Sequence, residues 1–132
     1  MQFNPCIKHK LIRNSARHFA ETELAPIAAE IDQQRRFPRD VIAKMRALNY
    51  FGLQVPKEYG GAALDSISTA IVVEEISRVC AAVGLCVTVH NGVAVYPFLQ
   101  FANPSQKEIY LPQMASGKMI GAFSLTEANA GS

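Results

Sequence analysis

The residue types best suited to chemistry stand together at the end of the chain, in the stretch GAFSLTEANAGS at positions 121–132. Its first half has the apolar composition of a strand, and its second half is a loop of small and polar residues. A fixed hydroxyl such as that of Thr126, together with backbone amides, can stabilise negative charge. Gly131 has no side chain, so an anionic group can approach the backbone closely there. Taken alone, the stretch is more typical of a strand end followed by a plain polar loop.

Other residues capable of chemistry have simpler interpretations. Cysteine occurs at positions 6, 80 and 86, and three cysteines without CxxC spacing argue against both a disulfide framework and a metal site. His90 lies in an uncharged stretch, where we expect a hydrogen-bonded packing residue. Glu74 stands four residues before Arg78, the favourable order for an ion pair on a helix surface. We therefore assign no catalytic residue in this chain.

The composition is that of one globular domain. The 132 residues are 49% hydrophobic and 18% charged, and the net charge of +2 is too small to indicate nucleic-acid binding. No Asp, Glu, Lys or Arg occurs between Arg78 and Lys107, a stretch long enough to span a bilayer. Polar residues interrupt this stretch, which favours a helix buried on all sides over a membrane span. Free thiols and an N-terminus without a secretory segment predict a cytoplasmic protein.

Apolar periodicity predicts an all-α protein of about five helices followed by one short strand. Steps of three and four run through positions 7–20, and Pro26 is expected to break or kink this helix. A helix is preferred in the uncharged stretch through Phe101, although the β-branched residues at 85–89 also suit a strand. Further helix starts are expected at Pro38, at Asp65 or Ser66, and at Asn103-Pro104. Positions 119–126 lose the helical period and predict a strand whose hydrogen-bonding partners lie on another segment or chain.

Six stretches, in this order, resemble the acyl-CoA dehydrogenase family. They are ELAPIAAEID at 23–32, VPKEYGG at 55–61, EEISRVCAAVG at 74–84, VHNG at 89–92, QKEIYLPQMASGK at 106–118 and the terminal GAFSLTEANAGS. Each is weak alone, but together they cover nearly the whole chain. The sequences VHN and YLPQMASG are most similar to those of short-chain, butyryl-type members. The family's ending reads LTEP-x-AGS followed by Asp, so Ala128 replaces the usual proline and is expected to loosen the turn.

The resemblance implies a helical N-terminal domain over residues 1–118 and the truncated start of a middle β-domain over residues 119–132. It implies FAD as cofactor and the α,β-dehydrogenation of fatty acyl-CoA thioesters, with hydride passing to the flavin N5. In the family the proton-abstracting glutamate belongs to the C-terminal domain, so Glu127 is not assigned as the base. Without that base and most of the sheet, this chain alone is expected to be inactive and not to hold FAD tightly.

The resemblance also implies which residues bind. Those implied for FAD are Phe123, Leu125, Thr126, Gly131 and Ser132. The first three would run along the flavin ring, and the last two would approach the pyrophosphate. Ser132 would also lie near the acyl-CoA, and Val89 and Val93 would wall the acyl-chain pocket, although plain core packing explains the two valines equally well.

Partners follow from the same resemblance, and two other hypotheses stay open. The complete enzyme would use acyl-CoA, pass electrons to electron-transferring flavoprotein, and form a homo-oligomer as the family commonly does. One alternative is a non-catalytic helical interaction module or truncated gene product of the same ancestry. The other is an unrelated helical interaction domain. A bound flavin spectrum separates the enzyme from the inactive module, and the gene sequence beyond Ser132 separates both from the unrelated domain.

Overall fold

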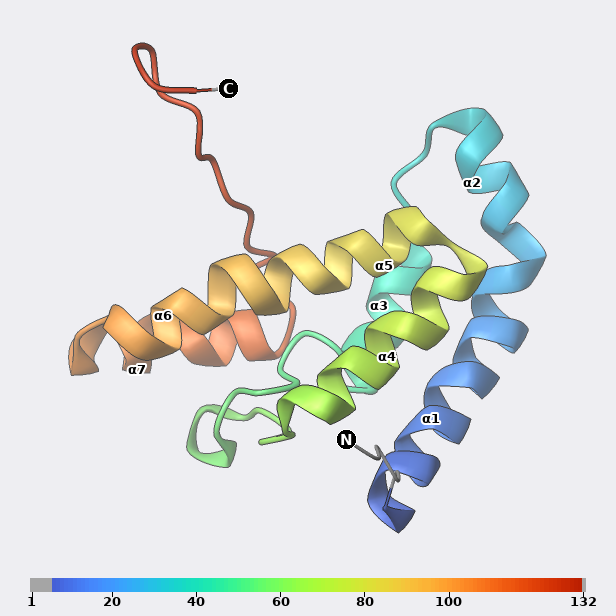
Figure 1. The fold of residues 1–132 in the computed structure, drawn as a ribbon, viewed down its shortest axis with the longest axis horizontal. Coiled ribbons are helices and arrows are strands. Elements are labelled where there is room, and N and C mark those ends of the chain that lie inside the picture. The colour runs from blue at the N-terminus through green and yellow to red at the C-terminus, as the bar shows by residue number, and fades with distance from the viewer. Residues whose placement is uncertain (1–5, 132) are drawn as a thin grey trace, which may run out of the picture.

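The computed structural model describes residues 6–131, and within that range the chain forms five helical rods and a long tail (Figure 1). The first rod joins α1 (Ile7–Phe19), η1 (Ala20–Leu24), η2 (Ala25–Ile27) and α2 (Ala28–Gln34). The fourth joins α5 (Ala81–Thr88), η4 (Val89–Val95) and α6 (Tyr96–Phe101). The others are α3 (Arg39–Ala47), α4 (Ser66–Val79) and α7 (Pro104–Ala115), and a single turn, η3 (Lys57–Tyr59), lies in the loop before α4. The predicted all-α fold of about five helices is confirmed.

Both composite rods change their helical winding just ahead of a proline. The π-helical turns η1 and η4 precede Pro26 and Pro97, respectively. Proline has no amide hydrogen to donate to the carbonyl four residues earlier, and its ring clashes with that carbonyl. A wider π turn relieves this mismatch without ending the helix. The disturbance expected at Pro26 is therefore a local change of winding, and the rod continues to Gln34.

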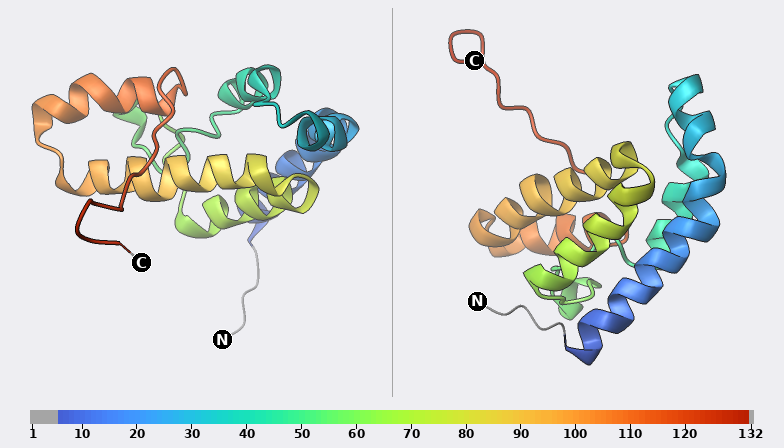
Figure 2. Two further views of the ribbon diagram at one scale, coloured as in Figure 1. Left: turned by 90° about the horizontal axis from the view of Figure 1, so that it is seen from above. Right: turned by 45° about the vertical axis from the view of Figure 1, so that its right-hand side comes forward.

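Two predicted helix starts carry side-chain caps. The Asp65 carboxylate accepts a hydrogen bond from the Ser68 amide at 2.7 Å and begins α4. Asn103 and Gln106 cap the start of α7 reciprocally, with hydrogen bonds of 2.9 and 3.0 Å. These bonds satisfy amides that have no partner in the first turn of a helix. The second cap also reverses the chain, so that α7 runs back alongside α6 (Figures 1 and 2).

The main core lies where α1, α3, α4 and α5 meet, and its fully buried residues include Leu24, Met45, Phe51 and Ile76. A smaller apolar cluster joins η4 to α7 and to the loop at Val55. This second cluster fixes the position of α7, and therefore the point from which the tail departs.

An ion-pair network ties α1 to α4. Glu75 is only 1% exposed, and its carboxylate accepts hydrogen bonds from Arg13 at 2.6 Å and Arg17 at 2.9 Å. The predicted pair of Glu74 with Arg78 is wrong for the described structure. Glu74 pairs with Arg13 at 2.9 Å, and Arg78 pairs with an acid on η1 at 2.8 Å. Glu74 and Arg78 pair with residues of the first rod, and not with each other, because that rod packs directly against this face of α4.

The uncharged stretch forms one helical rod of 21 residues, Ala81–Phe101, and not a strand. Within residues 6–131 it is the one helix long and apolar enough to cross a membrane by length and composition. Its middle, however, carries His90 and Asn91, which are buried and hydrogen-bonded to neighbouring elements, as in a core helix. The prediction of burial on all sides is wrong, since Leu85 is 62% and Phe101 87% exposed. No described element covers that side of the rod.

The strand predicted at 119–126 is not formed in the described structure. This segment has no regular secondary structure and projects from the helical body (Figures 1 and 2). A strand needs a neighbour to receive its backbone hydrogen bonds, and no segment within residues 6–131 offers one. The single bridge here joins Glu127 to Ala130 at the tip of the tail.

Candidate functional site

An apolar groove of about 590 Å³ runs between η4, α6, α7 and the start of the tail. Aromatic and aliphatic side chains from all four segments form most of its wall: Val93, Phe98, Phe101, Tyr110, Met119 and Phe123. None of its described lining residues is a carboxylate, a lysine or an arginine. A groove of this size and composition suits an apolar chain or a flat aromatic ring.

The α6–α7 pair forms two sides of this groove. The cap at Asn103 turns the chain sharply after α6, which brings Phe98 and Tyr110 together. Their rings meet edge to face, with centroids 5.5 Å apart, a favourable aromatic arrangement. Because both rings also line the groove, the same contact that joins the helices shapes the cavity wall.

The buried side chain of His90 joins three segments beneath the groove. Its Nε2 lies 3.0 Å from the Phe51 carbonyl oxygen and 3.2 Å from that of Met114, while its Nδ1 lies 2.9 Å from the Gly121 amide nitrogen. Two carbonyl acceptors and one amide donor require hydrogen on Nε2 and a lone pair on Nδ1. Burial lowers the pKa of His90, which agrees with this neutral ring.

Asn91 performs a similar task one position later. Its Nδ2 donates to the carbonyl oxygens of Tyr50 at 2.9 Å and Val87 at 3.0 Å, and its Oδ1 accepts from the Leu53 amide at 3.3 Å. The loop after α3 is thus held against η4 by two consecutive polar side chains. The sequence-based interpretation of His90 as a hydrogen-bonded packing residue is confirmed, and the structure adds that it anchors the tail.

Gly121 must be a glycine for the tail to leave the helices where it does. A Cβ atom at this position would lie 2.5 Å from the Ala94 Cβ atom, far inside van der Waals contact. The backbone can therefore reach His90 only without a side chain. Past Gly121 every described residue is exposed.

The tip of the tail closes into a tight turn that holds two predicted binding residues. Glu127 and Ala130 exchange backbone hydrogen bonds of 2.7 and 3.2 Å, with Ala128 inside the turn. A Cβ atom on Gly131 would lie 2.9 Å from Thr126 Cγ2, so these two residues are adjacent. Leu125 is exposed beside them. Ser132 lies outside the described residues.

The remaining predicted site residues separate into two groups. Phe123 and Val93 both line the groove, from the tail and from η4. Val89 is half-buried and is not part of the groove wall. Sequence reasoning missed Phe98 and Phe101 as groove residues because it treated the uncharged stretch as buried, and it missed Tyr110 on the helix that follows. The signal for them was an aromatic-rich run ending at a capped turn.

The backbone of the tail is exposed from Ala122 to Gly131. Between Ala122 and Thr126, no backbone amide donates to another group of the described chain, so these donors remain available. Gly131 lies against the Thr126 side chain, where a Cβ atom would come within 2.9 Å of Thr126 Cγ2. No group of three or more His, Cys, Asp or Glu side chains able to hold a metal occurs in the part of the chain that is described.

Comparisons with known proteins agree on one family. The family described as "Acyl-CoA dehydrogenase, N-terminal domain" matches residues 7–118. The chain is 42% identical over 131 residues to the short-chain specific acyl-CoA dehydrogenase of Clostridium acetobutylicum. The matched region covers 99% of this chain and 35% of that protein.

Solved structures show the same relationship. A chain in the structure described as electron transferring flavoprotein of Acidaminococcus fermentans superposes with a TM-score of 0.93 at 37% identity, covering 99% of this chain and 34% of that one. The acyl-CoA dehydrogenase of Bacillus anthracis, complexed with FAD, gives a TM-score of 0.88 at 32% identity, covering 97% and 22%. The chain thus spans about a third of the length of the curated relative it matches, 35%.

Proposed function

The chain belongs to the acyl-CoA dehydrogenase family through its N-terminal domain, and on this premise we propose that it is the helical part of an FAD-dependent dehydrogenase of short-chain acyl-CoA thioesters. The reaction removes one hydrogen from each of two neighbouring carbons, the α-hydrogen as a proton and the β-hydrogen as a hydride. Bound FAD would supply the hydride acceptor. The domain boundary is proposed at residue 118, where the tail begins.

The observation that carries this proposal is the apolar groove with the tail anchored at its edge. Val93 and the aromatic residues of α6 and α7 form an apolar wall suited to a short acyl chain. Phe123 reaches the same groove from the tail, which His90 holds at Gly121. One element of the chain would therefore contact the acyl group while the next contacts the cofactor.

The roles proposed for the tail follow its chemistry. Phe123, Leu125 and Thr126 would lie along the flavin ring, where free amides and a hydroxyl stabilise negative charge without reorganising. Gly131 and Ser132 would approach the pyrophosphate, and Ser132 would also lie near the thioester. Val93 is the proposed acyl-chain contact, whereas Val89 would act through the packing of η4.

The general base is proposed to lie outside this chain. No carboxylate is among the described residues of the groove wall, and relatives are about three times longer. General acid–base catalysis contributes roughly 10²–10⁴-fold. The chain alone is therefore expected to be inactive and to bind FAD weakly. Electron-transferring flavoprotein as acceptor, assembly with further copies and a cytoplasmic location belong to the proposed complete enzyme.

A chimera tests the function directly. This chain replaces the matching N-terminal third of the Clostridium acetobutylicum relative, with the unaltered relative as control. We expect the chimera to purify yellow, with stoichiometric FAD that butyryl-CoA bleaches under anaerobic conditions. The isolated chain, treated in the same way, should carry no stoichiometric flavin. A folded chimera that holds no FAD would contradict the proposed function and favour a non-catalytic helical module.

A further inference from the structure

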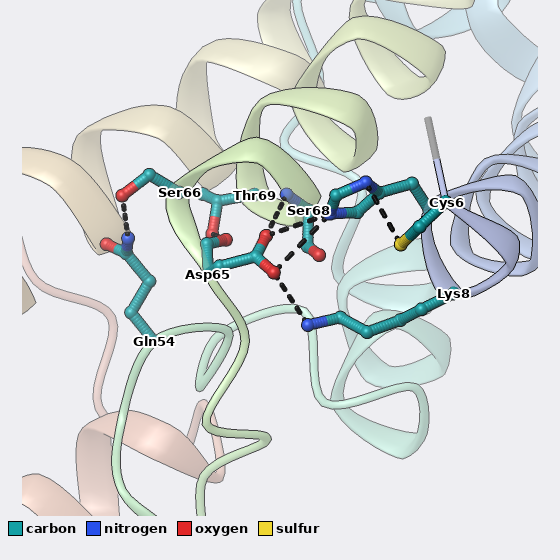
Figure 3. Close-up of polar contacts among 8 residues, drawn as sticks. Cys6, Lys8, Gln54, Asp65, Ser66, Ser68 and Thr69 are labelled. Atoms are coloured by element: carbon teal, nitrogen blue, oxygen red, sulfur yellow. Dashed lines mark hydrogen bonds and ion pairs between the residues drawn. The ribbon is translucent and has the colours of Figure 1, made fainter. Parts of the chain in front are cut away.

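A second cluster of reactive side chains lies where the N-terminal ends of α1 and α4 meet, away from the groove (Figure 3). Cys6 is the residue that precedes α1, His9 lies in the first turn of that helix, and Asp65 caps α4. The Cys6 Sγ lies 3.4 Å from His9 Nδ1, and His9 Nε2 lies 3.3 and 3.4 Å from the two Asp65 oxygens. Thiol, imidazole and carboxylate are therefore connected in series.

The carboxylate at the end of this series is fixed in place and in charge. Asp65 accepts from Lys8 Nζ at 2.6 Å and from the Ser68 amide at 2.7 Å. The Lys8 ammonium, and then the Ser68 amide, hold the pKa of Asp65 well below its usual value. An ionised Asp65 orients hydrogen onto His9 Nε2, which leaves the Nδ1 lone pair facing the thiol.

The thiol and the imidazole of this cluster differ in their exposure to solvent. The Cys6 residue is exposed, while the His9 side chain is only 12% exposed. The nucleophile thus faces solvent, and the proton acceptor behind it is shielded. A sulfur at this position also lies at the positive end of α1, where negative charge is favoured.

The other two cysteines provide an internal contrast. Cys80 and Cys86 are half-buried. Burial raises the pKa of Cys86, which keeps it protonated. No histidine side chain hydrogen-bonds to either sulfur among the described residues. The three thiols of one molecule therefore differ in access and in the presence of a base.

The geometry points to Cys6 as a modification site, a nucleophilic thiol that exchanges with small, anionic disulfides. The Cys6 proton passes to His9 Nδ1, and the sulfur attacks one sulfur of the disulfide RSSR. The S–S bond of RSSR breaks, a new S–S bond forms to Cys6, and the departing thiolate takes the proton from His9 to leave as RSH. The Cys6 sulfur is oxidised and the departing sulfur is reduced, so electrons and protons balance.

Charge near the thiol favours an anionic partner. Lys10 stands one helical turn beyond Cys6, its amide donating to the Cys6 carbonyl at 3.1 Å, and its exposed ammonium adds positive charge to this end of α1. The Lys8 ammonium offsets the negative charge of Asp65, so the Lys10 charge is not cancelled by that carboxylate. This reactivity does not depend on the dehydrogenase assignment, so either proposal can fail without the other.

The test treats the full 132-residue chain with glutathione disulfide under native conditions and follows each cysteine by peptide mass spectrometry. We expect Cys6 to be modified about 10-fold faster than Cys80 and Cys86, with the difference abolished in the urea-unfolded chain. The His9→Gln variant should slow Cys6 about 10-fold or more, since it removes the proton acceptor. Asp65→Asn, which still caps α4, should give a smaller loss.

Controls make each outcome decisive. His18→Gln changes an exposed histidine on the same helix and should leave the Cys6 rate unchanged. Circular dichroism checks that each variant keeps its helices. The proposal is overturned if Cys6 reacts no faster in the native chain than in urea, a comparison that requires no variant. It is equally overturned if a folded His9→Gln protein reacts at the original rate.

Discussion

The imidazole of His90 accepts a hydrogen bond from the backbone amide of Gly121, 31 positions later, with Nδ1 and N separated by 2.9 Å. This contact connects the middle of the long helical rod to Gly121, near the start of the tail. The opposite ring nitrogen donates to Phe51 and Met114. One buried side chain thus decides where the proposed flavin-binding segment leaves the helices.

Replacement of His90 by Phe should destabilise the fold and release the tail. Two buried carbonyls and one amide would lose their partner, and each such group costs about 1–3 kcal/mol. Urea denaturation should show the lower free energy of unfolding, and hydrogen exchange should show faster exchange at the Gly121 amide. The exposed His18→Phe variant is the control and should shift stability by less than about 0.5 kcal/mol. Equal effects of the two substitutions would count against the anchoring role.

Stability should fall on mild acidification because of the same residue. Burial lowers the pKa of His90 below its ordinary value of 6.5. Below that pH the unfolded chain binds a proton at this side chain that the folded protein does not, so the free energy of unfolding decreases by up to about 1.4 kcal/mol per pH unit.

His90→Gln should remove this acid-dependent loss when urea denaturation is compared at about pH 7 and pH 5.5. Asp65 and Glu75 affect the stability of the fold in a separate, lower pH range. Their partners lower the pKa of each carboxyl, so their contributions are present above the unfolded pKa values and are lost only below about pH 4.5. An unchanged slope between pH 7 and 5.5 in His90→Gln would mean that another group controls the acid response.

Substitution of Gly121 by Ala should displace the tail. The new Cβ atom would lie 2.5 Å from the Ala94 Cβ atom, so the backbone must move away from His90. We expect a loss of about 1–3 kcal/mol in thermal unfolding and faster hydrogen exchange at residue 121. Gly92→Ala is the matched control, since nothing lies within 4 Å of its Cβ position. That control should be neutral or stabilise the helix by up to about 1 kcal/mol, and a loss as large as that of Gly121→Ala would refute the steric argument.

Neutralisation of Glu75 should lower the free energy of unfolding far more than neutralisation of Glu74. Glu75 is 1% exposed and holds Arg13 and Arg17, whereas the Glu74 side chain is 62% exposed. We expect Glu75→Gln to lower the free energy of unfolding by about 1–3 kcal/mol and Glu74→Gln by less than about 0.5 kcal/mol. Urea denaturation at low and high salt measures both. Similar losses for the two variants would show that burial does not distinguish them.

Local features of the sequence predicted most of the helices. The caps at Asp65 and Asn103 act within three residues, and both are formed as expected. The uncharged stretch was predicted as a helix because its apolar run is too long for a strand. The strand at 119–126 failed for the opposite reason, since a strand depends on a partner that the described chain does not supply.

The binding roles assigned to the site residues stay predictions, and the structure shows only where these residues lie. Similarity of short motifs pointed to Phe123, Thr126, Gly131 and Val93. In the structure Phe123 and Val93 line the same groove, and Thr126 lies next to Gly131. The sequence could not indicate that Phe101 would be exposed and would line the groove. Hydrophobicity alone does not show which face of a helix other elements cover.

By itself, the sequence determined the helical periods, the capped starts and the family, because these depend on residues close together in the chain. Only the tertiary structure decided that Glu75 would meet Arg17, 58 positions away, and that His90 would hold Gly121. Such contacts depend on how helices cross and which side chains then compete for each charge or lone pair. That competition takes place between segments distant in sequence, so no local pattern records its outcome.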